Sequence, residues 1–275
     1  SGNGPFPGVL IMPGHYSEGK AAQVLQSLCM LLASNDIAAL IIDPIGQSER
    51  GQIINPATGK LVDTNTSGTD SQTKMDMGSV LVGRGAAGWE LWDNTRALDY
   101  LYSRTDVVDT SRIAITGSSG GGAQALFLIS TEYNRIEAAA ITSWVTNKSH
   151  IFAVAGLFAG SHHFFDQGIH HIDQTENMLM FAPMPLIMIA ASQDFIDTAG
   201  THETAAEMVD IYNSLNVPGQ ISYYESPDVH GYTQPKREAC TRWFKQWFYN
   251  DTSKVVDPLF RNFSSTALKV TSTGA

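Results

Sequence analysis

The sequence predicts an α/β fold in which a mostly parallel, twisted sheet is flanked by helices. Short apolar runs alternate with longer segments that carry apolar residues at helical spacing, a pattern typical of parallel strands joined by crossover helices. No apolar run approaches the roughly 18 residues that a membrane-spanning helix needs. The 275 residues are enough for one substantial core, so a soluble protein of one or two domains is expected.

Six apolar runs are expected to be strands, because each is short and stops at polar or turn-forming residues. They are residues 8–12, 37–42, 112–116, 136–142, 185–191 and 220–224. The first run stops at Pro13-Gly14 and the second at Asp43-Pro44, which are turn-forming pairs. Their length and apolar character favour buried strands of a parallel sheet.

Five longer segments carry apolar residues at helical spacing and are expected to be helices. They are residues 20–33, 89–102, 121–129, 201–215 and 236–248. Between the second strand and the second helix, residues 46–88 are rich in Gly, Thr, Ser and Asp, which predicts a long excursion from the sheet. Residues 145–183, which follow the strand at 136–142, are too many for a simple crossover. They are expected to form a helical insertion over the sheet edge.

One catalytic domain is predicted over residues 1–250, with the insertion included. Residues 251–275 form a polar tail rich in Ser and Thr. Residues 267–270 of this tail are expected to be a strand that leads to a further domain.

Charge and cysteine content restrict the classes of partner. The formal net charge of −10 argues against nucleic acid or an anionic membrane as the main partner, and it is compatible with a neutral substrate. The two cysteines, Cys29 and Cys240, both fall in expected helices. Buried thiols are expected there, with a single disulfide as the alternative.

The segment Gly117-Ser118-Ser119-Gly120-Gly121 matches the pattern G-x-S-x-G with Ser119 at its centre. It lies between an expected strand and an expected helix, where a sharp turn exposes a nucleophilic hydroxyl. The flanking glycines let this turn tighten, and the N–H of Gly120 is expected to face a developing oxyanion. We therefore predict that Ser119 is a nucleophile. The alternatives are a glycine-rich turn without chemistry, or Ser118 as nucleophile, which Thr116 disfavours because the pattern requires Gly there.

A serine nucleophile needs a base, and the base needs a group that orients it. In the chain order Ser, acid, His, the last two follow successive strands. Asp194 follows the expected strand at 185–191, and His230 follows the one at 220–224, next to a glycine that helps to place the imidazole. We predict the triad Ser119-His230-Asp194. Asp197 is the rival acid, helix capping is the alternative role of Asp194, and a surface position is the alternative for His230.

The loop after the first strand is expected to supply the second oxyanion donor. The N–H of His15 is the first candidate and that of Tyr16 the second; the His15 side chain could contribute, or it could be structural. Tyr16 and Trp144 are also candidates for lining a substrate pocket.

Several other polar and aromatic residues are expected to be structural. The pairs His162-His163 and His170-His171 have no metal-ligand spacing and no nearby Cys, which favours a polar lid over a zinc site. No metal and no cofactor is expected. Glu49 and Arg50 are expected to form local ion pairs rather than to contact substrate. Three tryptophans are expected in the core, namely Trp89, Trp92 and Trp144.

Taken together, these motifs resemble the α/β-hydrolases of the acetyl xylan esterase-like branch, which is related to dienelactone hydrolases. The matching stretches are Gly14-His15 with Gly19-Lys20, Asp43-Pro44-Ile45-Gly46-Gln47 with Glu49-Arg50, Gly88-Trp89 with Trp92-Asp93, residues 96–101, Ile115-Thr116-Gly117 with Ser119-Gly120-Gly121-Gly122, Asp194-Phe195, and His230-Gly231-Tyr232. The resemblance implies an α/β-hydrolase fold and a metal-free serine esterase that removes acetyl or other small acyl groups from plant polysaccharides. It matches Ser119, Asp194 and His230 to the triad, and it implies a secreted or periplasmic location.

The resemblance leaves several alternatives open. In that fold the chain would begin on the third strand of the sheet. The usual leader strands are expected to have been removed, to come from another polypeptide or to be lacking in this lineage, and an excerpt of a longer protein is one interpretation. A further domain or a homo-oligomer is the expected partner. The rival activities are a glucuronoyl esterase, a dienelactone-type hydrolase and a peptidase. The alternative outside enzymology is a non-catalytic hydrolase-like domain that binds carbohydrate or acts as a scaffold.

Overall fold

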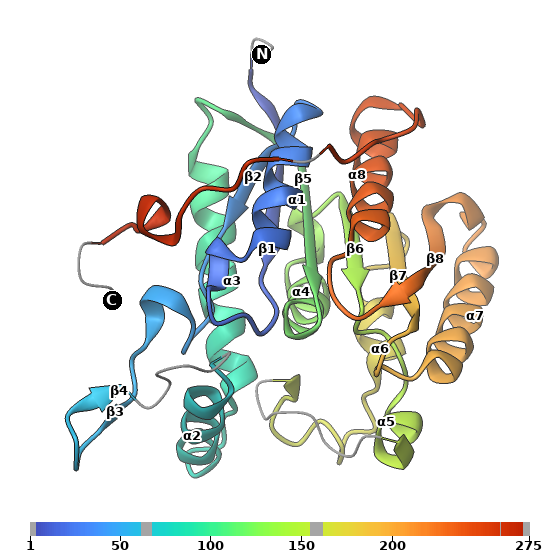
Figure 1. Ribbon diagram of the computed structural model, residues 1–275. Coiled ribbons are helices and arrows are strands. Elements are labelled where there is room, and N and C mark those ends of the chain that lie inside the picture. Colours follow the sequence, from blue (N-terminus) through green and yellow to red (C-terminus); the bar gives the residue numbers. More distant parts are fainter. Residues whose placement is uncertain (1–3, 62–67, 155–161, 259, 272–275) are drawn as a thin grey trace.

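Six parallel strands form the central sheet of the protein, seen in a computed structural model that describes residues 4–61, 68–154, 162–258 and 260–271 (Figure 1). The strand order across this sheet is β2-β1-β5-β6-β7-β8, and every neighbouring pair is parallel. The strands are β1 (Phe6–Met12), β2 (Ala38–Ile41), β5 (Val108–Ser118), β6 (Ala138–Thr142), β7 (Leu186–Gln193) and β8 (Ile221–Val229). The predicted parallel sheet is therefore confirmed.

Helices cover both faces of this sheet, as Figure 1 shows. The helices that pack directly on it are α1 (Gln23–Ser34), α3 (Ala86–Ser103), α4 (Gly120–Thr131), α7 (Thr198–Ser214) and α8 (Gln234–Tyr249), while α6 (Gln174–Leu179) packs on α4 and α7. Apolar side chains of α1 and α8 belong to one core cluster, and those of α3, α4, α6 and α7 belong to the other. All five predicted helices are confirmed, with ends shifted by a few residues.

The alternation of side chains along each strand creates these two cores. In β1, Leu10 and Met12 face the α3 and α4 side, whereas Val9 and Ile11 face the α1 and α8 side. All four are fully buried. The strands read as continuous apolar runs because both faces of the sheet are covered.

The predicted excursion and insertion are both present. The excursion holds the short turn η2 (Ser48–Arg50), the hairpin β3 (Ile54–Asn55) with β4 (Lys60–Leu61), and helix α2 (Thr69–Val80). The insertion holds α5 (Lys148–Val154) and α6, and part of it, residues 155–161, lies outside the described residues. Figure 1 places α2 and α5 near the same end of the sheet, the end at which the strands finish.

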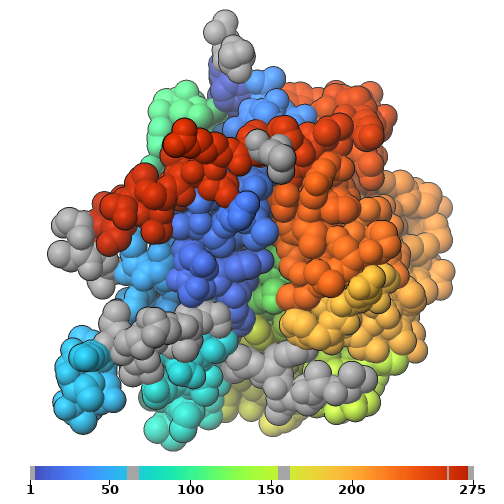
Figure 2. Space-filling view, viewed as in Figure 1, coloured from blue at the N-terminus to red at the C-terminus, as the bar shows by residue number. Residues whose placement is uncertain are grey.

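The C-terminal segment differs from the prediction. Residues 267–270 are not a strand; Ser265–Leu268 form a 3₁₀ turn, capped by the Ser264 hydroxyl, which accepts from the Ala267 N–H. The segment runs back across the N-terminal half of the molecule, as Figure 2 shows in red over blue. The Phe263 N–H donates to the Gln26 side chain at 2.8 Å, so this segment packs on α1. Its hydrogen-bonding groups are satisfied by side chains rather than by a strand partner.

Two smaller predictions can also be judged. Cys29 and Cys240 are free thiols, so the disulfide alternative is wrong; Cys240 is buried and Cys29 only partly exposed. Trp89 and Trp92 are 40% and 59% exposed, so the expectation that they belong to the core is wrong, whereas Trp144 is buried.

Within the described residues, no helix is both long and apolar enough to cross a membrane.

Candidate active site

Ser119 occupies a strained turn between β5 and α4. Its φ of 59° and ψ of −127° lie outside the regions that residues with a side chain favour. The turn is held by the Ser119 N–H, which donates to the Thr142 carbonyl of β6 at 3.0 Å. A Cβ on Gly121 would lie 1.9 Å from the Met12 carbonyl oxygen, so only glycine lets α4 start this close to β1. The predicted strand–turn–helix context of Ser119 is confirmed.

Asp194 and His230 meet at the same edge of the sheet. Asp194 follows β7 and His230 follows β8, and parallel neighbouring strands end side by side. The Asp194 Oδ1 and the His230 Nδ1 are 2.6 Å apart. Gly231 has a φ of +101°, a conformation that favours glycine, and so helps the loop to present the imidazole. The arrangement leaves the opposite ring nitrogen, Nε2, to act on a substrate or nucleophile.

The hydrogen bonds of the Asp194 carboxylate favour its ionised form. Its side chain is 2% exposed, and burial alone would raise its pKa. Hydrogen bonds from His230, from the Ile196 N–H and from the Ser143 hydroxyl outweigh burial, so the net pKa of Asp194 is lowered. Ser143 directly follows Thr142, which accepts from the Ser119 N–H. The end of β6 therefore links the Ser119 turn to the Asp194–His230 pair.

The rival acid, Asp197, has a different role. Its side chain caps α7 by accepting from the Gly200 N–H at 2.7 Å. It also lies 2.6 Å from the His150 ring of α5. Of the two carboxylates, the structure brings Asp194 and not Asp197 to His230.

Two further groups steady the His230 imidazole. The Phe195 ring packs against it with centroids 4.1 Å apart. The Lys236 side chain of α8 is fully buried, and its ammonium donates to the Val229 carbonyl at 2.6 Å, directly before His230 in the chain. Burial lowers the pKa of Lys236, against the opposing effect of Asp228 and Asp194. Sequence reasoning missed Lys236, because a lysine in an amphipathic helix gives no sign that it points inward.

The loop after β1 lies against the Ser119 turn. A Cβ on Gly14 would be 3.1 Å from the Ser119 Cβ. The Tyr16 N–H is already engaged, by the Gly14 carbonyl at 3.0 Å and the Gln47 side chain at 3.2 Å. The His15 N–H donates to no described residue, and the Gly120 N–H opens α4, where intrahelical acceptors are lacking. The geometry favours His15 over Tyr16 as the second oxyanion donor.

Tyr16 is tied to the loop that carries His230. Burial raises the pKa of its phenol, and a hydrogen bond with the Tyr232 backbone opposes this rise. The Tyr16 hydroxyl is also 3.6 Å from the position that a Cβ on Gly231 would take. This position makes Tyr16 a support of the His230 loop.

Trp144 and His162 together cover the start of α4. The Trp144 Cβ lies so close to Gly122 that a Cβ added to this glycine would be 2.6 Å from it. The His162 ring lies 4.7 Å from the Trp144 ring and 5.0 Å from the His15 ring, measured between centroids. Burial lowers the pKa of His162 well below its usual range. His162 therefore lies against the His15 and Trp144 rings, a position that sequence reasoning did not assign.

Two residues that are distant from His15 in the sequence form a chain of hydrogen bonds with its side chain. Its Nε2 is 2.7 Å from the Gln72 Oε1 of α2, and the Gln72 Nε2 donates to the Glu90 Oε1 of α3 at 2.9 Å. Gln72 and Glu90 are both buried. Burial lowers the pKa of His15, whereas it raises that of Glu90 to about 8. Sequence reasoning missed both residues, because they carry no recognisable motif.

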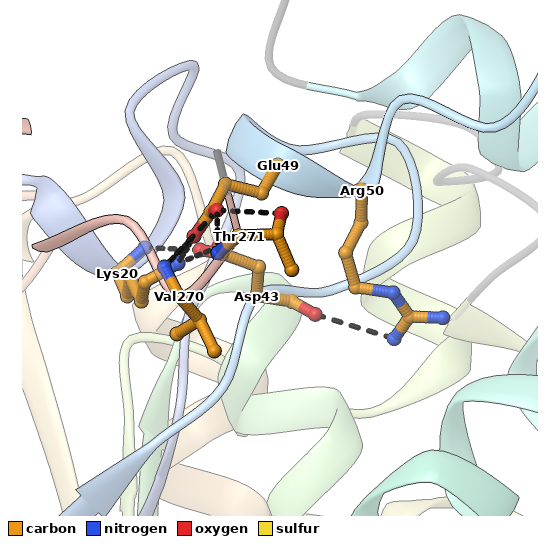
Figure 3. A network of polar contacts seen from close by, with 6 residues as sticks. All are labelled: Lys20, Asp43, Glu49, Arg50, Val270 and Thr271. Carbon is orange, nitrogen blue, oxygen red and sulfur yellow. Dashed lines mark hydrogen bonds and ion pairs between the residues drawn. The ribbon is translucent and has the colours of Figure 1, made fainter. Parts of the chain in front are cut away.

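Glu49 and Arg50 belong to a polar network that also includes Lys20 and Asp43 (Figure 3). Glu49 and Asp43 both form ion pairs with Lys20, and Arg50 pairs with Asp93 at 2.6 Å. Glu49 also accepts from the N–H groups of Val270 and Thr271, which fastens the C-terminal segment (Figure 3). Glu49 and Arg50 therefore form ion pairs, as expected, but with Lys20 and Asp93 rather than with each other.

A separate cavity of about 690 Å³ lies between α2 and the insertion. Its lining includes Asp76, Lys148, His163 and His171, but none of the three residues of the predicted triad. Among the described residues, no group of three or more His, Cys, Asp or Glu side chains is placed to hold a metal ion.

Comparisons with known proteins bear on the fold. No protein-family model matches the chain, and no curated protein matches its sequence. Solved structures do match. The methylesterase BT1017 has a TM-score of 0.65 and 19% sequence identity; the match covers 98% of this chain but 54% of that one, so this chain spans about half its length.

Two further solved structures match this chain with somewhat lower TM-scores and sequence identities. A glucuronoyl esterase of carbohydrate esterase family 15, from Caldicellulosiruptor kristjansonii, has a TM-score of 0.58 at 13% identity, over 95% of this chain and 73% of that one. The Pyrococcus furiosus esterase Pf2001 has a TM-score of 0.55 at 13% identity, over 90% and 85%. These neighbours share the parallel sheet with flanking helices that the described residues form, and the chain therefore has the α/β-hydrolase fold.

Proposed function

We propose that this protein is a serine carboxylic ester hydrolase that works through Ser119, His230 and Asp194. One observation carries the proposal: a strained Ser119 turn and a hydrogen-bonded Asp194–His230 pair both follow the carboxyl ends of strands of one parallel sheet. A strained backbone is costly and is typical of a nucleophile presented at a strand–helix turn. The names of the structural neighbours, which are esterases, agree with this chemistry.

The proposed reaction has two acyl-transfer steps. His230 Nε2 takes the Ser119 proton while the Ser119 Oγ bonds to the ester carbonyl carbon. The C–O bond to the alcohol then breaks, and His230 returns the proton to the departing alcohol oxygen. In the second step a water molecule gives a proton to His230 and attacks the acyl-enzyme, which releases the acid and restores Ser119.

Two groups of backbone and side-chain contacts support these steps. The N–H groups of Gly120 and His15 stabilise the oxyanion, and a donor of this kind typically contributes about 3 kcal/mol to the transition state. Asp194 holds His230 in the tautomer with its proton on Nδ1, and it stabilises the imidazolium as it forms. Its lowered pKa keeps the carboxylate charged for this purpose.

For the substrate, we propose an acetyl or other small acyl ester of a carbohydrate. The support is the resemblance to acetyl xylan esterase-like enzymes, together with two neighbours whose names are methylesterase and glucuronoyl esterase. The excess of acidic residues agrees with a neutral substrate. A location outside the cytoplasm would match such a polymer.

The experiment pairs a fluorophosphonate probe with turnover of p-nitrophenyl acetate. The wild-type chain is expected to be labelled on Ser119 and to hydrolyse the ester, and Ser119→Ala is expected to do neither. Ser118→Ala is the matched control, because Ser118 is the adjacent, fully buried serine at the end of β5. Undiminished turnover in Ser119→Ala would overturn the assignment. A wild-type chain without labelling or turnover would favour the non-catalytic, carbohydrate-binding alternative.

A further inference from the structure

The side chain of His15 has a defined protonation pattern, which the contacts of Gln72 determine. The Gln72 Nε2 lies 3.2 Å from the Ile45 carbonyl oxygen and 2.9 Å from the Glu90 Oε1. A carbonyl oxygen only accepts hydrogen bonds, so the amide nitrogen of Gln72 must face it. The Gln72 Oε1 is then left to face the His15 Nε2, at 2.7 Å.

This orientation determines the tautomer of His15. The Gln72 Oε1 only accepts, so the His15 Nε2 carries the proton and donates it. Burial lowers the pKa of His15, with the hydrogen bond to Gln72 opposing the change, so the ring is neutral near pH 7. In a neutral imidazole with its proton on Nε2, the Nδ1 has a lone pair and is an acceptor.

The acceptor nitrogen lies beside the Ser119 turn. A Cβ on Gly120 would be 3.0 Å from the His15 Nδ1, so this nitrogen lies over the first residue of α4. No described residue donates a hydrogen bond to it. A lone pair in this position repels an oxyanion, so the ring, unlike the His15 N–H, is unsuited to stabilise one. It suits a ligand that brings an O–H donor.

We infer that the His15 Nδ1 binds a substrate hydroxyl next to the reacting ester, so that the enzyme prefers esters of hydroxylated compounds. The inference rests on the proposed function and assigns one substrate-recognition contact to the same site. The hydroxyl could lie on the alcohol side, as in a partly acylated polyol or sugar, or on the acyl side, as in a 2-hydroxy acid ester. Both present the same donor, and one neutral hydrogen bond of this kind corresponds to about a tenfold preference.

The test uses two pairs of esters that match in size. On the alcohol side, 2-hydroxyethyl acetate is compared with propyl acetate; on the acyl side, ethyl glycolate is compared with ethyl propionate. The readout for each pair is the kcat/KM of the hydroxylated ester divided by the kcat/KM of the ester without the hydroxyl. This ratio does not change when a variant loses the same activity toward both esters. For the wild-type chain, a ratio of about ten is expected in one pair, and that pair identifies the side that carries the hydroxyl.

Two variants separate the role of the acceptor from a general role of the ring. His15→Phe keeps a planar ring without the acceptor, and its ratio is expected to fall to about one. His15→Asn keeps a polar atom near the position of Nδ1, and part of the preference is expected to return. A wild-type ratio near one in both pairs, or a ratio that persists in His15→Phe, would overturn the inference. Labelling of Ser119 by a fluorophosphonate is measured alongside, because its absence would overturn the proposed function instead.

Discussion

Replacement of Glu90 by Gln is expected to remove a pH dependence from the stability of the protein. Glu90 is 3% exposed, and burial raises its pKa from 4.5 to about 8, with Asp93 adding to the rise and Arg50 opposing it. The folded chain thus retains a proton that the unfolded chain releases between these pH values. The stability that this proton contributes is fully present below pH 4.5, and it is lost as the pH rises through about 8.

The magnitude follows from the same values. Each tenfold change in proton affinity corresponds to about 1.4 kcal/mol, so the pKa change corresponds to at most ~5 kcal/mol of lost stability at alkaline pH. Gln is uncharged, has nearly the shape of a protonated Glu, and still accepts from the Gln72 Nε2. Near pH 5 the variant should therefore match the wild type, and near pH 9 it should be more stable by about 2–5 kcal/mol.

The assay is urea unfolding followed by tryptophan fluorescence, at several pH values between 5 and 9. The quantity of interest is the free energy of unfolding of Glu90→Gln minus that of the wild type. Glu18→Gln is the control for the loss of one negative charge, because Glu18 is exposed on the loop after β1. A difference that stays constant across this pH range would refute the burial argument for Glu90, whatever its value.

Three further predictions concern the Asp194–His230 pair and the buried Lys236. Asp194→Asn is expected to lower kcat by about 10³–10⁴-fold with little change in KM, whereas Asp197→Ala, which removes the side-chain cap of α7, should keep kcat and lose about 1 kcal/mol of stability; equal losses of kcat in both would contradict the assignment. Because the pKa of folded Asp194 is lowered, its charge stabilises the fold above the unfolded value of about 3.9, and acid titration of stability should lose this contribution in Asp194→Asn. Lys236→Met is expected to lower kcat about tenfold or more and to lower the unfolding free energy by about 1–3 kcal/mol, because the Val229 carbonyl and the partly exposed Asp228 carboxylate both lose their partner; an unchanged kcat would show that the contact with the Val229 carbonyl does not position His230.

Local features of the sequence were sufficient to predict the elements of the sheet. The strands are short continuous apolar runs that stop at polar or turn-forming residues, whereas the helices carry apolar residues at helical spacing, so the six strands and five helices could be assigned before any contact was known. The tail shows the limit of this reasoning. Residues 267–270 are apolar enough to suggest a strand, but no strand partner is offered where they dock, and the Glu49 carboxylate accepts from the N–H groups of Val270 and Thr271 instead.

The sequence by itself determined the order Ser119, Asp194, His230 and the strand–turn–helix context of the serine, because turns and chain order are local properties. Only the tertiary structure decided that Asp194 rather than Asp197 meets His230, since both follow β7 within a few residues and only the direction of the turn separates them. The tertiary structure also showed that Gln72 contacts the His15 ring and that Glu90 contacts Gln72. These residues lie in α2 and α3, and no sequence motif predicts that the two helices pack next to His15. Side-chain burial and hydrogen-bond direction depend on contacts between distant segments, and for this reason the turn that carries Ser119 could be predicted from sequence while the tautomer of His15 could not.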